Sequence, residues 1–211
     1  DDGLTRALQR TAAPLGSRTV RVICQRLLQP TGRFRRRSLS LDVRQMQLMI
    51  DAERFDLIRR KHGAYGSWAV WAPPSSRPKS RVGDLQVLDE RANPGLLETL
   101  NPGVVMVGLN LSRGFPDQPF RNFHDPRPEA NDFKMRYAFL VLPFWGAYMT
   151  DIIKGVVEPD SGTLLNWLRR NPQVITEHVE TFRAELSDLG HPRPAILAFG
   201  GAAYHLLIQN L

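Results

Sequence analysis

The sequence predicts an α/β fold: a three-layer αβα sandwich around a central, mostly parallel sheet, preceded by a basic, helical N-terminal extension. Two observations support this prediction. Short apolar runs typical of buried strands alternate with helical stretches from about residue 104 onward, and strands separated by helices pack as a parallel sheet with right-handed crossovers. In addition, 42% of the 211 residues are hydrophobic, which is enough to bury a sizeable core.

The positive charge of the chain is concentrated at its N-terminus. The formal net charge is +7, and residues 1–50 hold ten Arg against three Asp, whereas basic and acidic residues balance in 51–211. We therefore divide the chain into a basic extension, 1–40, and an α/β domain, 41–211. Such an Arg-rich, acid-poor segment is typical of a phosphate-binding arm, of an organellar transit segment, or of a solvated face that docks on the rest of the domain. The arginines best placed to bind nucleic acid are Arg35, Arg36 and Arg37.

The secondary structure elements follow in chain order. A helix is expected from Ser40 to about Lys61, with Ser40 as its cap and Gly63 as its terminator. A short strand at 67–71 comes next. The continuous apolar run 104–107 indicates a strand that is buried on both faces. Further helices are expected at 132–140, 161–170, 172–189 and from 201 onward, with strands at 147–153 and 194–199.

The composition excludes several classes of protein. The single cysteine, Cys24, cannot form an internal disulfide, and the five His are too scattered to supply a ligand pair. We therefore expect no protein-held metal and no cofactor. No apolar run reaches the roughly 18 residues that a membrane span requires, so no membrane association is expected.

The candidate functional residues lie in or beside the loops that follow the predicted strands. Ligands of parallel α/β sheets bind at this edge. Four segments stand out: Gly108-Leu109-Asn110-Leu111-Ser112-Arg113-Gly114, Phe120-Arg121-Asn122-Phe123-His124-Asp125, Tyr148-Met149-Thr150-Asp151-Ile152-Ile153-Lys154 and Phe199-Gly200-Gly201-Ala202-Ala203.

Taken together and in this order, the four segments resemble the motifs of the uracil-DNA glycosylase superfamily. The first is similar to the Gly-hydrophobic-Asn motif of the mismatch-specific and thymine-type branches, and the third to the Tyr-hydrophobic-Thr-Asn…Lys strand of other branches. The likeness covers roughly residues 100–211. It implies a metal-independent DNA glycosylase of base-excision repair, which binds DNA, flips a damaged or modified base out of the stack and hydrolyses its N-glycosidic bond.

The resemblance also assigns roles to individual residues. Asn110 matches the residue whose amide holds the attacking water, because an oxocarbenium-like transition state needs a positioned water more than proton removal; its alternative role is to cap the loop. Phe123, or else Phe120, matches the aromatic that stacks on the flipped base, the alternative being a core position. His124 suits a base or phosphate oxygen, or a structural hydrogen bond. Further phosphate contacts are expected from Ser112, Arg113 and Lys154.

Asp151 departs from the family pattern, which has Asn at this position. An amide both donates and accepts, whereas an ionised carboxylate only accepts. A carboxylate suits an exocyclic amine such as cytosine N4 and repels uracil O4. Either the target base is not uracil, or Asp151 points elsewhere, for example to Lys154 three residues on.

The end of the chain departs from the pattern as well. The superfamily continues with a further strand and a His-containing loop, whereas this sequence stops at Leu211. We expect either an incomplete chain or a protein that lacks this strand and loop, in which case catalysis would be much impaired. Leu111 and Ser112 also replace the usual Pro-Gly of the first motif.

Two other functions therefore stay open. One is a catalytically inactive glycosylase-fold module, bound to DNA or RNA as a structural subunit of a larger assembly through its basic N-terminus. The other is a hydrolase of free nucleosides. We expect the protein in the cytoplasm or on the nucleoid, and the Arg-rich N-terminus leaves a mitochondrial location open.

Overall fold

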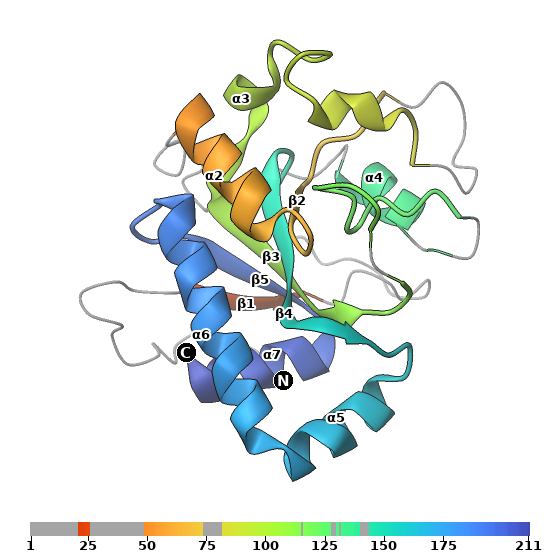
Figure 1. Cartoon of the computed structure of the whole chain (residues 1–211), viewed down its shortest axis with the longest axis vertical. Helices are drawn as coiled ribbons and strands as arrows, with labels where there is room; N and C mark the ends of the chain where they lie inside the picture. Colours follow the sequence, from red (N-terminus) through yellow and green to blue (C-terminus); the bar gives the residue numbers. More distant parts are fainter. Residues whose placement is uncertain are drawn as a thin grey trace, which may run out of the picture.

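The structure is a computed structural model, and it is a mixed α/β fold built on a mostly parallel sheet (Figure 1). The residues that it describes are 21–25, 49–73, 82–114, 116–127, 130, 132–139 and 144–211. The strands are β1 (Arg21–Gln25), β2 (Ser67–Trp68), β3 (Asn101–Leu111), β4 (Ala147–Val157) and β5 (Ala195–Phe199). The helices are α2 (Ala52–His62), α3 (Leu96–Thr99), α4 (Asp132–Phe139), α5 (Ser161–Arg170), α6 (Pro172–Leu189) and α7 (Gly200–Asn210), with a 3-10 turn at Leu85–Leu88.

The strand order explains where the helices lie. The sheet runs β1-β5-β3-β4-β2, in which β1, β5, β3 and β4 are parallel and β2 is antiparallel to β4. The chain moves from β3 to β4 in one direction and from β4 back past β3 to β5 in the other. Right-handed crossovers place the helices of these two connections on opposite faces of the sheet. In Figure 1, α6 crosses in front of the sheet and packs beside α2.

Alternate residues of β3 build a core on each face of the sheet. Val105 and Val107 lie in the core that contains Phe182 of α6, whereas Met106 lies in the core that contains Phe139 of α4. All five side chains are fully buried or nearly so. The expectation of a strand buried on both faces is therefore confirmed.

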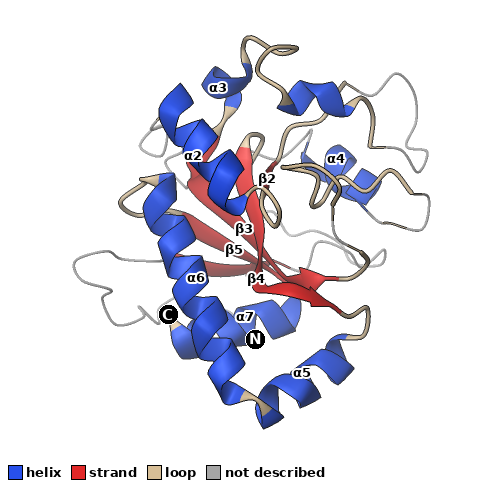
Figure 2. Cartoon of the chain, viewed as in Figure 1, coloured by secondary structure: helices blue, strands red, loops and turns tan. Residues whose placement is uncertain are grey.

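The second half of the fold follows local sequence signals closely. The predicted helices at 161–170 and 172–189 are present as α5 and α6. Pro172 begins α6, where its missing N–H costs nothing, and Gly190 ends it with a φ of 73°, in the left-handed region that favours glycine. The mixed α/β class with a mostly parallel sheet is confirmed (Figure 2).

Two expectations about the N-terminal part are corrected. The helix expected from Ser40 begins at Ala52, because Asp51 caps it by accepting a hydrogen bond of 2.7 Å from the backbone N–H of Arg54. Residues 21–25, expected to lie in a helical extension, form strand β1 and pair with β5. The other residues of 1–48 lie outside the described part of the chain.

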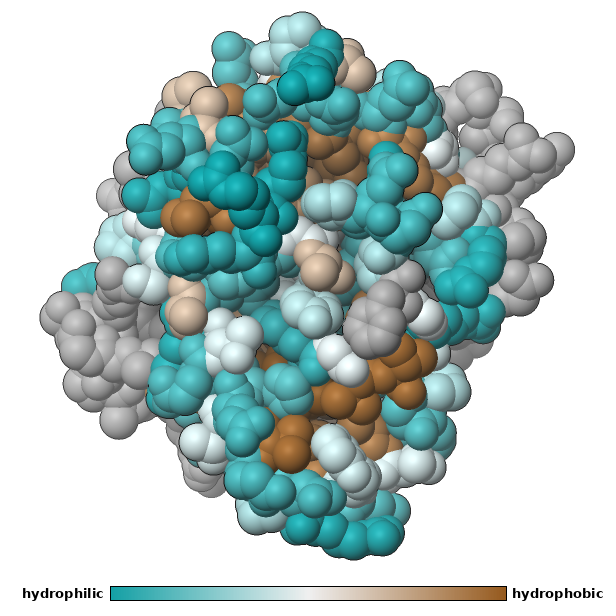
Figure 3. All heavy atoms as spheres, viewed as in Figure 1, coloured by the Kyte–Doolittle hydropathy of each residue, from teal (hydrophilic) through white to brown (hydrophobic). Residues whose placement is uncertain are grey.

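The surface facing the viewer in Figure 3 is mainly hydrophilic, with apolar patches between the polar groups. Large exposed apolar side chains include Val157, Trp167 and Ile208. Among the described residues, none of the helices combines the length and the apolar character needed to cross a membrane.

Candidate active site

A cleft of about 740 Å³ lies toward the carboxyl ends of β3 and β4, beneath the loop that follows β3. Ligands of parallel sheets bind at this edge, where the first motif leaves the sheet. The cleft brings together most of the residues predicted from the sequence. Those that line it are Asn110, Ser112, Arg113, Phe123, His124 and Asp151.

Gly108 lets a carboxyl group and an aromatic ring meet on the floor of the cleft. It pairs with Asp151 across β3 and β4. A Cβ atom added at Gly108 would lie 2.2 Å from Oδ1 of Asp151 and 3.4 Å from Cε1 of Phe123. A side chain at position 108 would displace the carboxyl group of Asp151, which explains the glycine at the start of the Gly-Leu-Asn motif.

The carboxyl group of Asp151 is held away from water. Its residue is 3% exposed, and Oδ2 accepts a hydrogen bond of 2.9 Å from Nδ2 of Asn122. Burial, the largest influence, raises the pKa of Asp151 to about 6. No described residue donates a hydrogen bond to Oδ1. A carboxyl group with a raised pKa in a cleft is typical of a functional position.

Asn122 fixes both the carboxyl group and the ring. Besides binding Asp151, its Nδ2 donates to the carbonyl oxygen of Tyr65 at 2.6 Å, and its Oδ1 accepts from the backbone N–H of Phe123 at 3.0 Å. Phe123 has a φ of 65°, a left-handed conformation that is unusual for a bulky residue and is common at functional sites. Sequence reasoning did not select Asn122, because its partner Asp151 is distant in the chain; its place within the Phe-Arg-Asn-Phe-His segment was the available signal.

The side chain of Asn110 binds the backbone at a register shift between β3 and β4. The register shifts so that Asn110 pairs with Ile153 while the next residue of β3 pairs with Val157, and Gly155 in this bulge has a φ of 72°. The Nδ2 atom of Asn110 lies 2.8, 3.2 and 2.9 Å from the carbonyl oxygens of Leu111, Val156 and Glu158, so its two N–H groups are shared among three acceptors.

The same hydrogen bonds orient the amide of Asn110. Three carbonyl acceptors fix Nδ2, so Oδ1 is the atom left for a ligand or a water molecule. Asn110 faces the same side of the sheet as Gly108, because Leu109 between them packs into the opposite core. Asn110 also lines the cleft, and it lies roughly 6.6 Å farther along β3 than Gly108.

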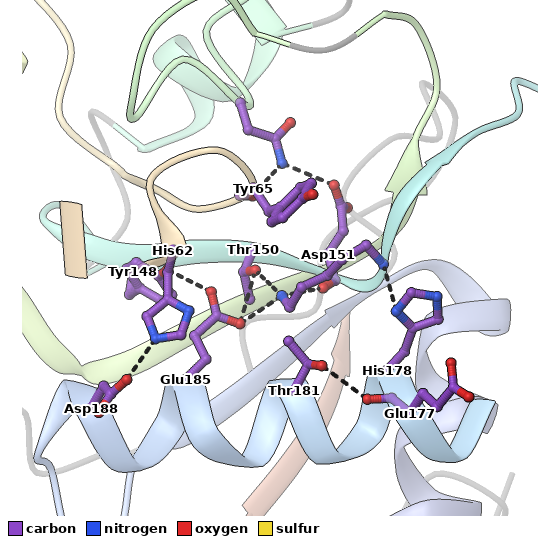
Figure 4. A network of polar contacts seen from close by, with 12 residues as sticks. His62, Tyr65, Tyr148, Thr150, Asp151, Glu177, His178, Thr181, Glu185 and Asp188 are labelled. Atoms are coloured by element: carbon purple, nitrogen blue, oxygen red, sulfur yellow. Dashed lines mark hydrogen bonds and ion pairs between the residues drawn. The ribbon is translucent and has the colours of Figure 1, made fainter. Parts of the chain in front are cut away.

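Lys154 is buried and does not line the cleft, which corrects its assignment as a phosphate contact. Its Nζ atom lies 2.6 Å from Oε2 of Glu185 on α6, and it donates to Oγ1 of Thr150 and to the backbone oxygen of Asp151 (Figure 4). Glu185 also accepts a hydrogen bond of 2.5 Å from the hydroxyl of Tyr148. The carboxylate of Asp151 therefore does not point at Lys154, the partner expected as an example, and binds Asn122 instead.

His124 is structural. It is fully buried, and its two ring nitrogens lie 3.1 Å from the carbonyl oxygens of Asn122 and Val70. Burial lowers the pKa of His124 to about 4, so the ring is neutral at physiological pH. The ring also stacks on Trp71, with centroids 4.9 Å apart. A neutral imidazole donates through only one ring nitrogen, so one of these two carbonyl contacts is a hydrogen bond, and burial of the whole ring keeps both nitrogens from a phosphate or a base.

Phe120 is a core residue, so Phe123 is the candidate for base stacking. Phe120 is 1% exposed and packs between Phe55 and Trp68, with ring centroids 5.3 and 6.4 Å away. Phe123 is half-buried and lines the cleft.

The rim of the cleft carries charges of both signs. Ser112 and Arg113 are exposed there, and Arg127 forms an ion pair with Asp125 that lowers the pKa of that carboxyl. Arg121, which was not selected from the sequence, also lines the cleft. Its Nη1 atom is buried and has no hydrogen-bond partner in the described part of the chain.

Three of the predicted residues cannot be placed in this site, and two histidines that were not predicted for it lie outside it. Arg35, Arg36 and Arg37 lie outside the described residues. His178 accepts a hydrogen bond of 3.4 Å from the backbone N–H of Lys154, and His205 is exposed beside Tyr204. In the described ranges, no group of three or more His, Cys, Asp or Glu side chains could hold a metal ion.

Comparisons with known proteins add no relative. No family model, no curated protein and no solved structure matches the chain.

Replacing Asp151 by Asn should change how stability depends on pH. Because the pKa is raised to about 6, the folded protein holds this proton more tightly than the unfolded chain, and stability falls as pH rises from about 4 to about 6. The free energy of unfolding of Asp151→Asn minus that of the wild type should therefore increase by about 2 to 3 kcal/mol between pH 4 and pH 7. Urea unfolding at several pH values measures this difference.

The difference between the two proteins is needed because His124 acts in the opposite direction. Its lowered pKa makes stability fall as pH drops from about 6.5 to about 4. This trend is present in both proteins and cancels in the comparison. A difference in stability that does not vary with pH would contradict the assignment of a buried, titrating Asp151.

A matched pair of Phe→Leu variants should distinguish the role of Phe123 from that of Phe120. Phe123→Leu should weaken base-dependent binding about tenfold, because base–aromatic stacking contributes about 1–3 kcal/mol, and should leave stability nearly unchanged. Phe120→Leu should lower the free energy of unfolding by about 1–2 kcal/mol and leave binding unchanged. Urea unfolding and oligonucleotide binding measure both effects, and the reverse pattern would exchange the two roles.

Proposed function

We propose that the protein hydrolyses the N-glycosidic bond of a damaged or modified base flipped out of DNA, in the manner of the uracil-DNA glycosylases that its motifs resemble. The observation that carries the proposal is the meeting of the Asp151 carboxyl group and the Phe123 ring over Gly108 on the floor of the cleft. A flipped base needs an aromatic surface on which to stack and a polar group that binds its edge.

The arrangement of the cleft supports an order of contacts along the nucleotide. A base that stacks on Phe123 beside Asp151 directs its sugar toward Asn110, which lines the same cleft. Oδ1 of Asn110 then accepts a hydrogen bond from a water near C1′. The water adds to C1′ as the C1′–N bond breaks, and the base leaves with the bonding electron pair and a proton. Positioning of the water is the main contribution that an amide can make.

The rim supports binding of the flanking phosphates. Arg113 and Arg121 line the mouth of the cleft, and guanidinium groups bind phosphate oxygens through charge-assisted hydrogen bonds. The buried, unpartnered Nη1 of Arg121 is a donor that an entering phosphate can engage after a small movement of the side chain.

The same proposal includes the three-layer αβα sandwich that the resemblance to the uracil-DNA glycosylases implies. It is supported by α6 and α7, which pack on one face of the sheet, and by α4, which packs on the other.

Formation of abasic sites tests the proposed function. The full chain is incubated with oligonucleotides that carry one uracil, hypoxanthine, mismatched thymine, cytosine or modified cytosine, and abasic sites are revealed by alkaline cleavage on a gel. We expect cleavage at the position of at least one of these bases. Absence of abasic sites from every oligonucleotide, with a folded protein, would contradict the proposal.

A second candidate is a nucleic-acid-bound module without catalysis. It is favoured by the positive charge concentrated in residues 1–50. Deletion of 1–40 would remove strand β1, so the arm is tested by changing Arg35, Arg36 and Arg37 to Gln. Each arginine that binds a phosphate should, when replaced, reduce the slope of log affinity against log salt by about 0.9. Binding that depends on these arginines and is indifferent to the base would favour this second candidate.

A further inference from the structure

The C-terminal end of α2 lies against the loop that borders the cleft. The backbone N–H of Phe120 donates a hydrogen bond of 2.8 Å to the carbonyl oxygen of Gly63, and a Cβ atom added at Gly63 would lie 2.8 Å from Cβ of Pro119. Asn122 extends this contact by donating to the carbonyl oxygen of Tyr65 at 2.6 Å. The end of α2 and the rim of the cleft therefore form one continuous surface.

The last turn of α2 carries a positive charge that is not neutralised. Three consecutive Arg and Lys residues lie in this turn, where the negative end of the helix dipole favours cations. Arg59 forms an ion pair with Asp56, and Lys61 forms one with Asp188. Arg60 is exposed, and its side chain forms neither an ion pair nor a hydrogen bond with any described residue. The charge of Arg60 is therefore available to a partner.

Arg60 lies on the side of α2 that meets the loop. It precedes Gly63 by three residues, and residues three apart on a helix are neighbours on one face. Gly63 is the position that approaches Pro119 of the loop. Two residues farther along the loop, Arg121 lines the cleft and has a buried Nη1 atom without a hydrogen-bond partner among the described residues. A cation on the helix and a cation on the loop therefore border the same junction.

The rim near α5 carries the opposite charge. Glu158 and Asp160 flank Pro159, which lines the cleft. Both carboxylates are held there, because Glu158 accepts a hydrogen bond of 2.9 Å from the backbone N–H of Asp160, and Asp160 caps α5. By contrast, the loop segment 112–121 holds two Arg and one Asp. A polyanion is repelled from the α5 side of the rim and attracted to the α2 side.

We propose that the strand of DNA flanking the bound nucleotide leaves the cleft past Arg121 and runs over the C-terminal turn of α2, where Arg60 binds one of its phosphates. This inference rests on the proposed function, because it places a nucleotide of DNA in the cleft. A guanidinium group binds phosphate oxygens through charge-assisted hydrogen bonds, and Arg60 does so without breaking an ion pair of the described structure. The helix α2, which lies outside the four motifs, thus becomes part of the interface.

Binding of single-stranded oligonucleotides tests the proposal. Each carries one tetrahydrofuran abasic analogue, which resembles the product of the proposed reaction and has no base left to lose. The strand is extended stepwise on its 5′ side only or on its 3′ side only, and fluorescence anisotropy measures affinity at several salt concentrations. We expect affinity to rise with length mainly on one side, and this gain to be lost in Arg60→Gln.

The salt dependence gives the expected size of the effect. One phosphate contact to a single strand contributes about 0.7 to the slope of log affinity against log salt. Arg60→Gln should therefore reduce the slope by about 0.7, so that the ratio of wild-type to variant affinity falls about threefold between 50 and 200 mM salt. Arg60→Lys keeps the charge and should keep most of the slope.

Arg170→Gln is the matched control. Arg170 is likewise exposed in the last turn of a helix, α5, and forms no ion pair with a described residue, so both variants lose one charge. Arg170→Gln should bind as the wild type does. The proposal is overturned if Arg60→Gln keeps the wild-type slope, loses no more of it than Arg170→Gln, or retains the gain in affinity with length.

Formation of abasic sites is scored separately on base-containing oligonucleotides, so the two proposals fail independently. Abasic sites formed by a protein whose binding is indifferent to Arg60→Gln overturn the path over α2 and leave the glycosylase function standing. A one-sided gain in affinity that Arg60→Gln removes, without abasic sites on any oligonucleotide, overturns the hydrolytic function and leaves the path standing.

Discussion

Replacing Lys154 by Met is expected to lower the free energy of unfolding by about 3–5 kcal/mol. The side chains of Lys154 and Glu185 are 5% and 0% exposed, and their charged atoms lie 2.6 Å apart. Removing the ammonium group leaves the carboxylate of Glu185 buried without its counter-charge, and desolvation of an unpaired ion is more costly than the pair itself. Urea unfolding monitored by circular dichroism measures the loss.

A double variant shows that the loss comes from the unpaired charge. In Lys154→Met/Glu185→Gln, no charge remains in the network, and the Gln amide oxygen can still accept from the hydroxyl of Tyr148. This variant should recover most of the lost stability. A Lys154→Met protein within about 1 kcal/mol of the wild type would be typical of a surface ion pair and would contradict the buried network.

Replacing Gly108 by Ala is expected to slow base excision about 100-fold, because displacement of a catalytic site by about 1 Å has effects of this size. The added Cβ would lie 2.2 Å from Oδ1 of Asp151. The carboxyl group would have to turn away from Gly108, which would strain its hydrogen bond to Asn122. Single-turnover rates of abasic-site formation, with urea unfolding to confirm the fold, measure the effect.

Gly95→Ala is the matched control for this substitution. A Cβ at Gly95 meets nothing within 4 Å, and its φ of −87° suits alanine. This variant should excise bases at the wild-type rate. A Gly108→Ala protein as active as Gly95→Ala would show that the floor of the cleft is not where the base binds.

Local signals in the sequence predicted the second half of the fold well. The Pro172 start and Gly190 end of α6 are decided by backbone chemistry within a few residues, and the apolar run at 104–107 needs only burial to become a strand. The start of α2 was predicted poorly, because Ser40 and Asp51 are both good capping residues and the sequence alone does not show which of them caps the helix.

The candidate site was only partly predictable, because its contacts join distant segments. Phe120 and Phe123 lie three residues apart and both adopt a positive φ, so only the packing of Phe120 against Phe55 and Trp68 separates their roles. Lys154 forms an ion pair with Glu185, which lies among the buried apolar residues of α6. A carboxylate in such a stripe predicts a buried partner, and this was the signal that could have redirected the assignment of Lys154.

The most direct test of the central claim is the single-turnover rate at which the wild type and Asn110→Ala convert a base-containing oligonucleotide into an abasic one. Unfolding and binding are measured in parallel to confirm that both proteins fold and bind. The account predicts abasic sites with the wild type and a rate about 100-fold lower with Asn110→Ala, because the water loses its acceptor. Equal rates in the two proteins, or no abasic sites from a folded wild type on any base, would contradict the account.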